Sequence, residues 1–371
     1  MRILILNWRD RLNPRSGGGD GLVHRVADYI AGQGHEVEML ASLFPGAKSS
    51  ERVGLIRVRR IGGEIDLHFS VFLGRCGQPD GWDVVWDVIN LLPWIRARRD
   101  TNRVRYRAMI HQLTYAALRL EINPLLASMG RLMEAKITPA VYRDVPLVVL
   151  SQSVRHECVR LGFRSENVVA IPPGIDYEAH ALEPCPDEHL RLLFIGRLRA
   201  YKGVQYLLQA MPLVLRRFPN ARLDIVGRGP YQPHLMNLSR RLRVEHSVSF
   251  HGFVAEPGKL DLMRRSWMVL LPSIQEGWGI PIMEAAAAAV PAIGTDTSGL
   301  RDSIVQGSTG FLVPVGDARA IAEAIVRLAE DRPLREEFGR NAKRRAQAFD
   351  WSLQLPKYAS FLLQEGRMPS A

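Results

Sequence analysis

The chain has 371 residues, of which 47% are hydrophobic and 23% are charged, and at roughly 150 residues per domain this length predicts two or three domains. No stretch approaches the roughly 18 consecutive apolar residues of a membrane-spanning helix, which excludes a transmembrane protein. Asn7 and Arg9 interrupt the apolar start, which argues against a secretory signal. Cys76, Cys158 and Cys185 lie far apart and predict neither a disulfide framework nor a zinc knuckle, so we expect a cytoplasmic protein.

Basic residues outnumber acidic residues by 49 to 38, a formal net charge of +11. An excess of this size leaves a nucleic-acid partner open. The densest basic cluster contains Arg96, Arg98, Arg99, Arg103, Arg105 and Arg107. A solvated surface is the simplest interpretation of this cluster. Contact with an acidic substrate or, peripherally, with an anionic membrane at the inner membrane surface is the second interpretation, and nucleic acid is the third.

Short apolar runs alternate with longer amphipathic segments along the chain, which indicates parallel sheets covered by helices. In the first half the pattern predicts, in order, a strand at 3–6, a loop at 16–21, a helix at 22–33, and strands at 37–40, 84–86, 108–110 and 147–150. Residues 171–190 break the alternation with prolines and acidic residues, so we place a linker there.

The alternation then begins again. We expect, in order, a strand at 191–195, a helix at 204–218, a strand at 222–226, a helix at 231–242, strands at 247–251 and 267–271, a helix at 281–289, a strand at 292–293 and a last long helix at 318–328. Two doubly wound α/β domains that face each other across a cleft are the simplest assembly. Because open parallel sheets bind ligands beyond the carboxyl ends of their strands, we expect the site at the cleft.

The strongest functional motif lies in residues 272–285, which read as a strand end, a glycine-flanked loop and a helix start. Glu276 and Glu284 stand eight positions apart in this motif, and Pro281 suits the first turn of the helix. The backbone N–H groups of Gly277–Ile280 predict an anion site that could hold a diphosphate without a metal. The simpler alternative is that Glu284 complements the helix dipole and Glu276 is solvated.

Two further loops carry weaker signals. Arg197 and Lys202 follow a predicted strand. The planar guanidinium of Arg197 and the compact ammonium of Lys202 both suit phosphate oxygens, and the alternative is a purely structural basic loop. The glycine-rich segment 16–21 would let backbone approach a ligand closely, although it lacks the G-x-G-x-x-G spacing and could be a plain mobile loop. His111, at the end of a predicted strand, is a candidate ligand contact or a structural histidine. No D-x-D pair occurs, which argues against a metal-held sugar donor.

The ordered set of motifs resembles the family-four retaining glycosyltransferases of the GT-B fold over nearly the whole chain. The set runs 34–37, 151–153, 173–176, 196–203, 227–230, 251–253, 276–284, 297–300 and 310–313. Ala289, Pro173 and Asp302 depart from residues that are usual in the family. The resemblance implies an N-terminal acceptor-side Rossmann-like domain at 1–175, with a crossover helix at about 350–371, and a C-terminal donor domain at 186–349.

The resemblance also implies roles for individual residues. It assigns catalysis to Arg197, Lys202, Glu276 and His111. It assigns donor binding to Gly17, Gly18, Gly19, Gly277, Trp278, Gly279, Ile280 and Glu284. Backbone near Gly252, Phe253 and Val254 would contact the nucleobase. We expect the first domain to bind the acceptor, through Asp87, Asn90 and the region 115–132, and the alternative is that these segments are packing elements.

These assignments predict a metal-independent, hexosyltransferase-like enzyme with no cofactor. It would move a sugar from a nucleotide diphosphate sugar to an acceptor hydroxyl of a glycan, a lipid-linked acceptor or a natural product, with retention of the anomeric configuration. The first alternative is a nucleotide-sugar epimerase or an inactive donor-binding relative of the same fold. The second alternative is a basic nucleic-acid-binding protein.

Overall fold

The computed structural model describes residues 1–72, 81–94, 104–115 and 117–364. The chain divides into two compact units. Unit 1 comprises Met1–Tyr115, Asn123–Pro173 and Ser352–Ala371, and unit 2 comprises Ala116–Ile122 and Gly174–Trp351. Each unit is an α/β layer structure around one sheet, which confirms the predicted fold class.

Unit 1 contains an eight-stranded sheet in the order β3-β4-β2-β1-β5-β6-β7-β8, parallel except for the β3–β4 pair. Its strands are β1 (Arg2–Leu6), β2 (Glu36–Ala41), β3 (Ser50–Val53), β4 (Ile56–Arg60), β5 (Val84–Ile89), β6 (Arg105–Ile110), β7 (Leu147–Val149) and β8 (Val168–Ala170). Its helices are α1 (Gly18–Gly32), α2 (Glu64–Phe72), α4 (Pro124–Leu132), the π-helix η2 (Met133–Ile137), α5 (Thr138–Val141), α6 (Gln152–Arg160), η3 (Ser165–Asn167) and α15 (Trp351–Leu363). Side chains of α2 and α6 share one apolar cluster with the central strands.

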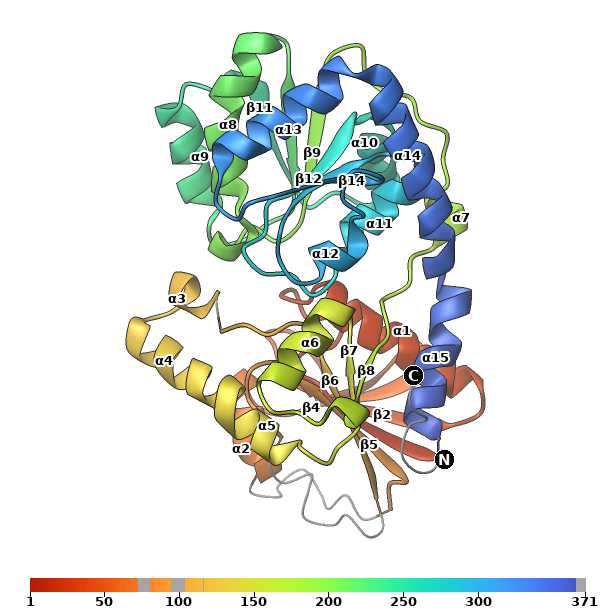
Figure 1. The fold of residues 1–371 in the computed structure, drawn as a ribbon. Helices are drawn as coiled ribbons and strands as arrows, with labels where there is room; N and C mark the ends of the chain where they lie inside the picture. The colour runs from red at the N-terminus through yellow and green to blue at the C-terminus, as the bar shows by residue number, and fades with distance from the viewer. Residues whose placement is uncertain (73–80, 95–103, 116, 365–371) are drawn as a thin grey trace. The chain divides into compact units, whose positions relative to one another are not determined.

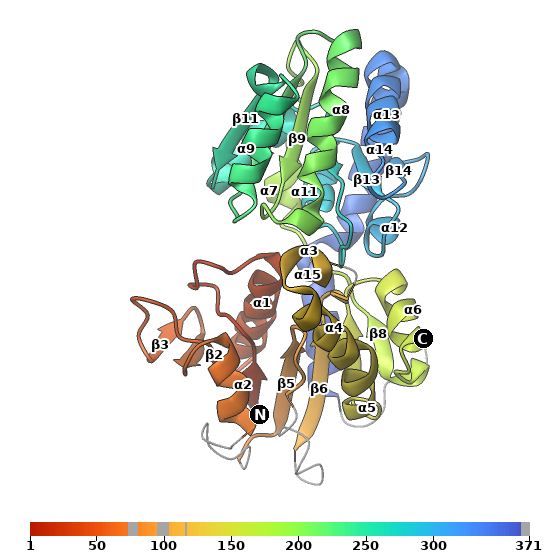
Figure 2. The same ribbon diagram turned by 90° about the vertical axis from the view of Figure 1, so that its left-hand side faces the viewer.

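Unit 2 contains a six-stranded parallel sheet in the order β11-β10-β9-β12-β13-β14. Its strands are β9 (Arg191–Ile195), β10 (Arg222–Val226), β11 (Val248–Gly252), β12 (Met268–Leu271), β13 (Ala292–Thr295) and β14 (Gly310–Val313). Its helices are α3 (Leu118–Glu121), α7 (Tyr177–His180), η4 (Ala200–Lys202), α8 (Val204–Arg217), α9 (Gln232–Arg241), η5 (Glu245–Ser247), α10 (Glu256–Arg265), α11 (Ile280–Ala287), α12 (Leu300–Ser303), α13 (Ala318–Glu330), α14 (Arg332–Ala346) and η6 (Gln347–Phe349). Figure 2 shows α8 and α9 on one side of this sheet.

Two sequence expectations are wrong. The segment 16–21 is not a free loop, because α1 begins at Gly18 and Gly17 is its N-cap. The Asp20 carboxylate accepts the Gly17 N–H at 2.9 Å, so an acidic residue three positions into the helix extends it back into the glycine run. The helix expected at 318–328 is not followed directly by the crossover helix expected at about 350–371, because α14 lies between α13 and α15. Most residues of α14 are charged or polar, so its narrow apolar face, which includes Phe338 and Ala342, does not stand out in the sequence.

Candidate active site

The strand order of unit 2 brings two of the predicted loops side by side. β9 and β12 pair in parallel, and the chain winds outward from them in opposite directions. Ligands of open α/β sheets bind where the strand order reverses in this way, at the carboxyl ends of the strands. Residues 196–203 leave β9 and residues 272–280 leave β12, so both loops start at the reversal point.

Backbone contacts fix these two loops against each other. Gly203 has a φ of +72°, and a Cβ on it would lie 1.9 Å from the carbonyl oxygen of Pro272. Only glycine permits this approach. The Ile274 N–H donates to the Tyr201 carbonyl at 2.8 Å. The loop that carries Lys202 and the loop that carries Glu276 therefore form one rigid platform.

Lys202 and Glu276 form the central ion pair of this platform. Lys202 Nζ lies 2.6 Å from Glu276 Oε2, and the Ser273 hydroxyl donates to the same oxygen at 3.1 Å. The two side chains are 13% and 12% exposed. Burial alone would lower the pKa of Lys202, but the adjacent Glu276 carboxylate outweighs burial and raises the pKa above its usual value. The ammonium is therefore charged at neutral pH, and Glu276 Oε1 takes part in neither contact.

Arg197 adds a second positive charge to this platform. Its side chain is exposed, and its charge acts against protonation of Lys202. Across the described part of the chain, no carboxylate forms an ion pair with the Arg197 guanidinium. This fork of N–H donors is therefore available to an anion from solution, such as a phosphate group.

The start of α11 supplies backbone donors. Gly279 adopts a left-handed conformation with φ of +90°, and Pro281 stands in the first turn of the helix. No side chain caps this N-terminus, so its N–H groups can meet an anion. Trp278 is 5% exposed and its ring lies 5.1 Å from that of Phe349. This aromatic contact indicates that Trp278 anchors the loop through packing.

The neighbouring strand end holds the loop from the other side. A Cβ on Gly299 would lie 2.4 Å from the carbonyl carbon of Gly277 and 2.7 Å from the carbonyl oxygen of Glu276. The Thr297 hydroxyl donates to the Ile274 carbonyl at 3.1 Å, and the Thr295 hydroxyl donates to the Ser273 carbonyl. These contacts fix the backbone at Glu276 and Gly277.

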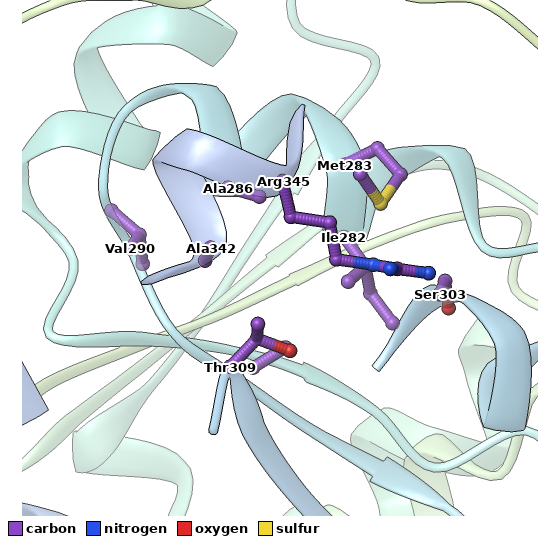
Figure 3. Close-up of a pocket in the computed structure, with 9 residues that line it drawn as sticks. Ile282, Met283, Ala286, Val290, Ser303, Thr309, Ala342 and Arg345 are labelled. Atoms are coloured by element: carbon purple, nitrogen blue, oxygen red, sulfur yellow. The ribbon is translucent and has the colours of Figure 1, made fainter. Parts of the chain in front are cut away.

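Arg345, a half-buried arginine of α14, packs beside α11 and α12. Figure 3 shows Arg345 of α14 reaching across a small cavity beside α11 toward Ser303 of α12. Its Nη2 donates to the Asp302 carbonyl at 2.6 Å. Burial lowers the pKa of Arg345 below its usual value. Arg345 thus ties α14 to α12, the short helix that follows Gly299.

Glu284 belongs to a second polar cluster. Lys259 Nζ lies 3.0 Å from Glu284 Oε1 and 2.9 Å from Glu256 Oε1. Burial alone would lower the pKa of Lys259, but Glu284 and then Glu256 raise it above its usual value. The ligand atoms of His180, Glu256 and Glu284 all lie within 4.8 Å of one another, which is close enough for a metal. The Lys259 ammonium already pairs with both carboxylates, so a metal would have to compete with it.

The remaining donor residues of unit 2, at 252–254, lie at the end of β11 and directly after it. Gly252 has a φ of +67°, and a Cβ on it would lie 3.4 Å from Arg228 Nε. Phe253 is 72% exposed. An exposed aromatic ring next to a glycine with positive φ offers a face for a planar base, and the backbone of residues 252–254 remains a prediction for that contact.

In unit 1, the structure brings Gly19 and His111 together. His111 Nε2 lies 3.2 Å from the Gly19 carbonyl, to which it donates. A Cβ on Gly19 would lie 3.0 Å from the histidine ring, so glycine is what permits this contact. Asn90 lies close by at the end of β5, where its Nδ2 is 3.3 Å from Asn7 Oδ1. β1 and β5 are neighbours at the point where the strand order of this sheet reverses.

Two expectations about unit 1 need correction. Asp87 is 0% exposed and accepts a hydrogen bond from the Tyr142 hydroxyl at 2.8 Å. Burial raises its pKa well above the usual value, so we assign Asp87 to the core and not to the acceptor. The second expectation concerns the arginine cluster at 96–107, which we interpreted as a solvated surface. Arg107 donates to the Phe361 carbonyl at 2.9 Å, and Arg105 donates to the Leu363 carbonyl at 3.0 Å.

The arginine cluster is therefore not one free surface. Arg105 and Arg107 satisfy carbonyls at the end of α15, which is a structural role. Arg96, Arg98, Arg99 and Arg103 lie outside the described residues, as does Cys76.

Sequence reasoning missed several residues that shape the site. Lys259 is one of only six lysines in the chain, and this scarcity could have marked it. Gly299 and Thr297 lie within the motif at 297–300, but their contacts with the Glu276 loop depend on the pairing of β12 with β13. Ser273 lies within the motif at 272–285 but was not singled out, and no local pattern marks His180.

Comparisons with known proteins place this chain in a family. Residues 178–345 match the model of glycosyl transferases group 1, and residues 16–179 match the model of Glycosyltransferase Family 4. The chain belongs to the family-four glycosyltransferases and has their GT-B fold, as the resemblance predicted.

Individual relatives agree with this assignment. The chain is 28% identical to a phosphatidyl-myo-inositol mannosyltransferase from Mycobacterium leprae, a match that covers 91% of this chain and 90% of the relative. Among solved structures, sucrose-phosphate synthase from Thermosynechococcus elongatus has a TM-score of 0.82 at 20% identity, with 97% of each chain covered. Anabaena HepE in complex with UDP-glucose has a TM-score of 0.76 at 18% identity, covering 98% of this chain and 99% of HepE.

Proposed function

We propose that this glycosyltransferase takes a sugar from a nucleotide diphosphate sugar and transfers it to an acceptor hydroxyl with retention of the anomeric configuration, without a divalent metal. The observation that carries the proposal is the platform at the strand-order reversal of unit 2. It combines the Lys202 ammonium, the Arg197 guanidinium and the uncapped N-terminus of α11. A diphosphate needs such a set of positive and N–H donor groups.

The proposed chemistry follows from where charge develops. As the bond between the anomeric carbon and the β-phosphate oxygen breaks, negative charge grows on the departing diphosphate. Lys202, Arg197 and the amides of residues 277–280 would stabilise this charge, which is the task that a metal performs in other transferases. The acceptor oxygen would bond to the anomeric carbon on the same face, and its proton would pass to the departing phosphate oxygen.

The two glutamates have separate proposed tasks. Glu276, oriented by Lys202 and Ser273, would accept hydrogen bonds from hydroxyls of the transferred sugar. Glu284, oriented by Lys259, would accept hydrogen bonds from the ribose. We keep Gly19 and His111 of unit 1 as proposed contacts of the transferred sugar. We propose a nucleoside diphosphate sugar as the donor because HepE, a structure of the same fold, is in complex with UDP-glucose.

The acceptor is proposed only as a hydroxyl compound. The printed names of the relatives differ, since one is a phosphatidyl-myo-inositol mannosyltransferase and another is a glycogen synthase. Both names are compatible with a hydroxyl acceptor, but they point to different chemical classes.

A thermal-shift panel of UDP, GDP, ADP and their sugars, recorded in EDTA, tests the donor. A ligand present at a hundred times its Kd stabilises a protein by about 2.7 kcal/mol. We expect one nucleoside diphosphate series to raise Tm without metal. No shift with any member would contradict the proposal. Conversion of the sugar without an acceptor would instead indicate an epimerase.

A further inference from the structure

The helix formed by α4, η2 and α5 in unit 1 presents its apolar face to solvent. Leu125, Leu126, Met129 and Leu132 are 71%, 55%, 57% and 57% exposed. Positions 125, 129 and 132 recur with the i, i+4, i+7 spacing of one helix face. Figures 1 and 2 show α4 along the outside of unit 1.

The buried side of the same helix has the opposite composition. Ala127 and Gly130, two small residues, are buried, as is Glu134. Glu134 accepts the backbone N–H groups of Thr114 and Tyr115 at distances of 2.6 to 2.8 Å. The helix is therefore fixed to the segment that follows β6 by hydrogen bonds, its buried side carries small residues, and its large side chains lie outside. A surface helix of a globular protein normally has the reverse arrangement.

The charges on this helix select the partner. Its exposed ionic side chains are Arg131 and Lys136, and both are cationic. Its one carboxylate, Glu134, is buried. Lys136 follows Leu132 by four positions, so it lies on the apolar face itself. Large apolar side chains bordered by exposed cations suit the boundary between acyl chains and anionic headgroups.

We propose that this face, formed by Leu125, Leu126, Met129 and Leu132 with Arg131 and Lys136, docks the protein on an anionic lipid bilayer. The apolar side chains enter the headgroup region, and the two cations stay at the level of the phosphates. This surface differs from the arginine cluster considered from sequence, in which Arg105 and Arg107 bind α15.

Sedimentation of the full chain with vesicles tests the proposal. Phosphatidylcholine vesicles with and without phosphatidylglycerol are compared at low and high salt. The test variant is Leu125→Gln with Met129→Gln, because glutamine keeps helix propensity. The control is Leu55→Gln with Leu353→Gln, two leucines that are 50% and 52% exposed elsewhere on unit 1. Circular dichroism verifies that both variants fold.

We expect wild type and control to sediment with the anionic vesicles, and the α4 variant to bind them at least about tenfold more weakly. Arg131→Gln with Lys136→Gln should weaken binding and reduce its salt dependence. Failure of wild type to sediment, or equal binding by the α4 variant, would overturn the proposal. Dimerisation of wild type without lipid that the α4 variant abolishes would also overturn it, because a second copy would then cover the face.

Discussion

Lys259 Nζ lies 3.0 Å from Oε1 of Glu284, and both side chains are largely buried at 14% and 15% exposure. The ion pair leaves the second carboxylate oxygen of Glu284 outside this contact. Lys259 is thus a positioning residue for the carboxylate that we assign to the ribose. A partly buried carboxylate that loses its cation also loses its fixed orientation.

We therefore predict that Lys259→Met raises the KM for the donor by about tenfold and changes kcat much less, since the loss is in ground-state binding. Steady-state kinetics against donor concentration measures both constants. Lys343→Met is the control, because Lys343 pairs at 3.3 Å with Glu183, whose side chain is 89% exposed. An unchanged donor KM in Lys259→Met would refute the positioning role.

Gly299 should be essential for the shape of the donor loop. Its φ is +79°, and an added Cβ would overlap the backbone of Gly277 and Glu276. Gly307 has a φ of +71°, but nothing lies within 4 Å of its Cβ position. Both alanine variants should lose about 1 kcal/mol of stability from left-handed strain.

Only Gly299→Ala should also displace the loop. We predict at least about tenfold weaker binding of the nucleoside diphosphate by Gly299→Ala and near-normal binding by Gly307→Ala, as measured by calorimetry. Equal affinities in the two variants would show that the contact with Gly277 does not shape the site.

A similar pair of glycines tests unit 1. A Cβ on Gly19 would lie 3.0 Å from the His111 ring, whereas nothing lies within 4 Å of a Cβ on Gly21. Gly21→Ala should raise the free energy of unfolding by about 0.5–1 kcal/mol because alanine is the better helix former. Gly19→Ala should displace His111 and lower the transfer rate by about tenfold or more. If Gly19→Ala and Gly21→Ala transfer sugar equally fast, His111 has no role at the sugar site.

His24 makes stability depend on pH. Its side chain is 1% exposed on α1, and burial, followed by the charge of Arg11, lowers its pKa from 6.5 to about 4. The unfolded chain takes up a proton near pH 6.5, whereas the folded chain takes it up only near pH 4. The stabilisation is therefore complete above pH 6.5 and is lost as pH falls toward 4, by about 3 kcal/mol in total.

Urea unfolding at several pH values measures this dependence. We predict that His24→Leu flattens the decline between pH 6.5 and 4, and that His156→Leu, at an exposed position, leaves it as in wild type. A decline that is equally steep in His24→Leu and wild type would assign the acid sensitivity to other groups.

Much of the fold was predictable because apolar residues repeat with a different period in strands and in helices. The strands on both sides of the site were predicted to within one or two residues, as with β9 at 191–195 and β12 at 268–271. Loops that follow central parallel strands meet at one sheet edge, so the meeting of Lys202 and Glu276 followed from the order of elements. What sequence could not supply was the orientation of each side chain.

Asp87 shows that limit most clearly. An aspartate near the end of a strand is a reasonable ligand contact, yet its side chain points into the core and holds Tyr142. The departure at Ala289 has a visible consequence, since this residue has a φ of +57°, which glycine adopts without strain. Lys259 was missed because its approach to Glu284 joins α10 to α11, and no local pattern encodes that contact.

The most direct test of the account is calorimetric titration, in EDTA, of the nucleoside diphosphate that gives the largest thermal shift. Wild type, Lys202→Ala and Lys48→Ala are compared. Lys48→Ala is the control because Lys48 is exposed and is distant in sequence from the loop at 196–203. The account predicts metal-free binding by wild type and Lys48→Ala and at least about tenfold weaker binding by Lys202→Ala, because a hydrogen bond from a charged group is lost. Binding by Lys202→Ala with the affinity of wild type would contradict it.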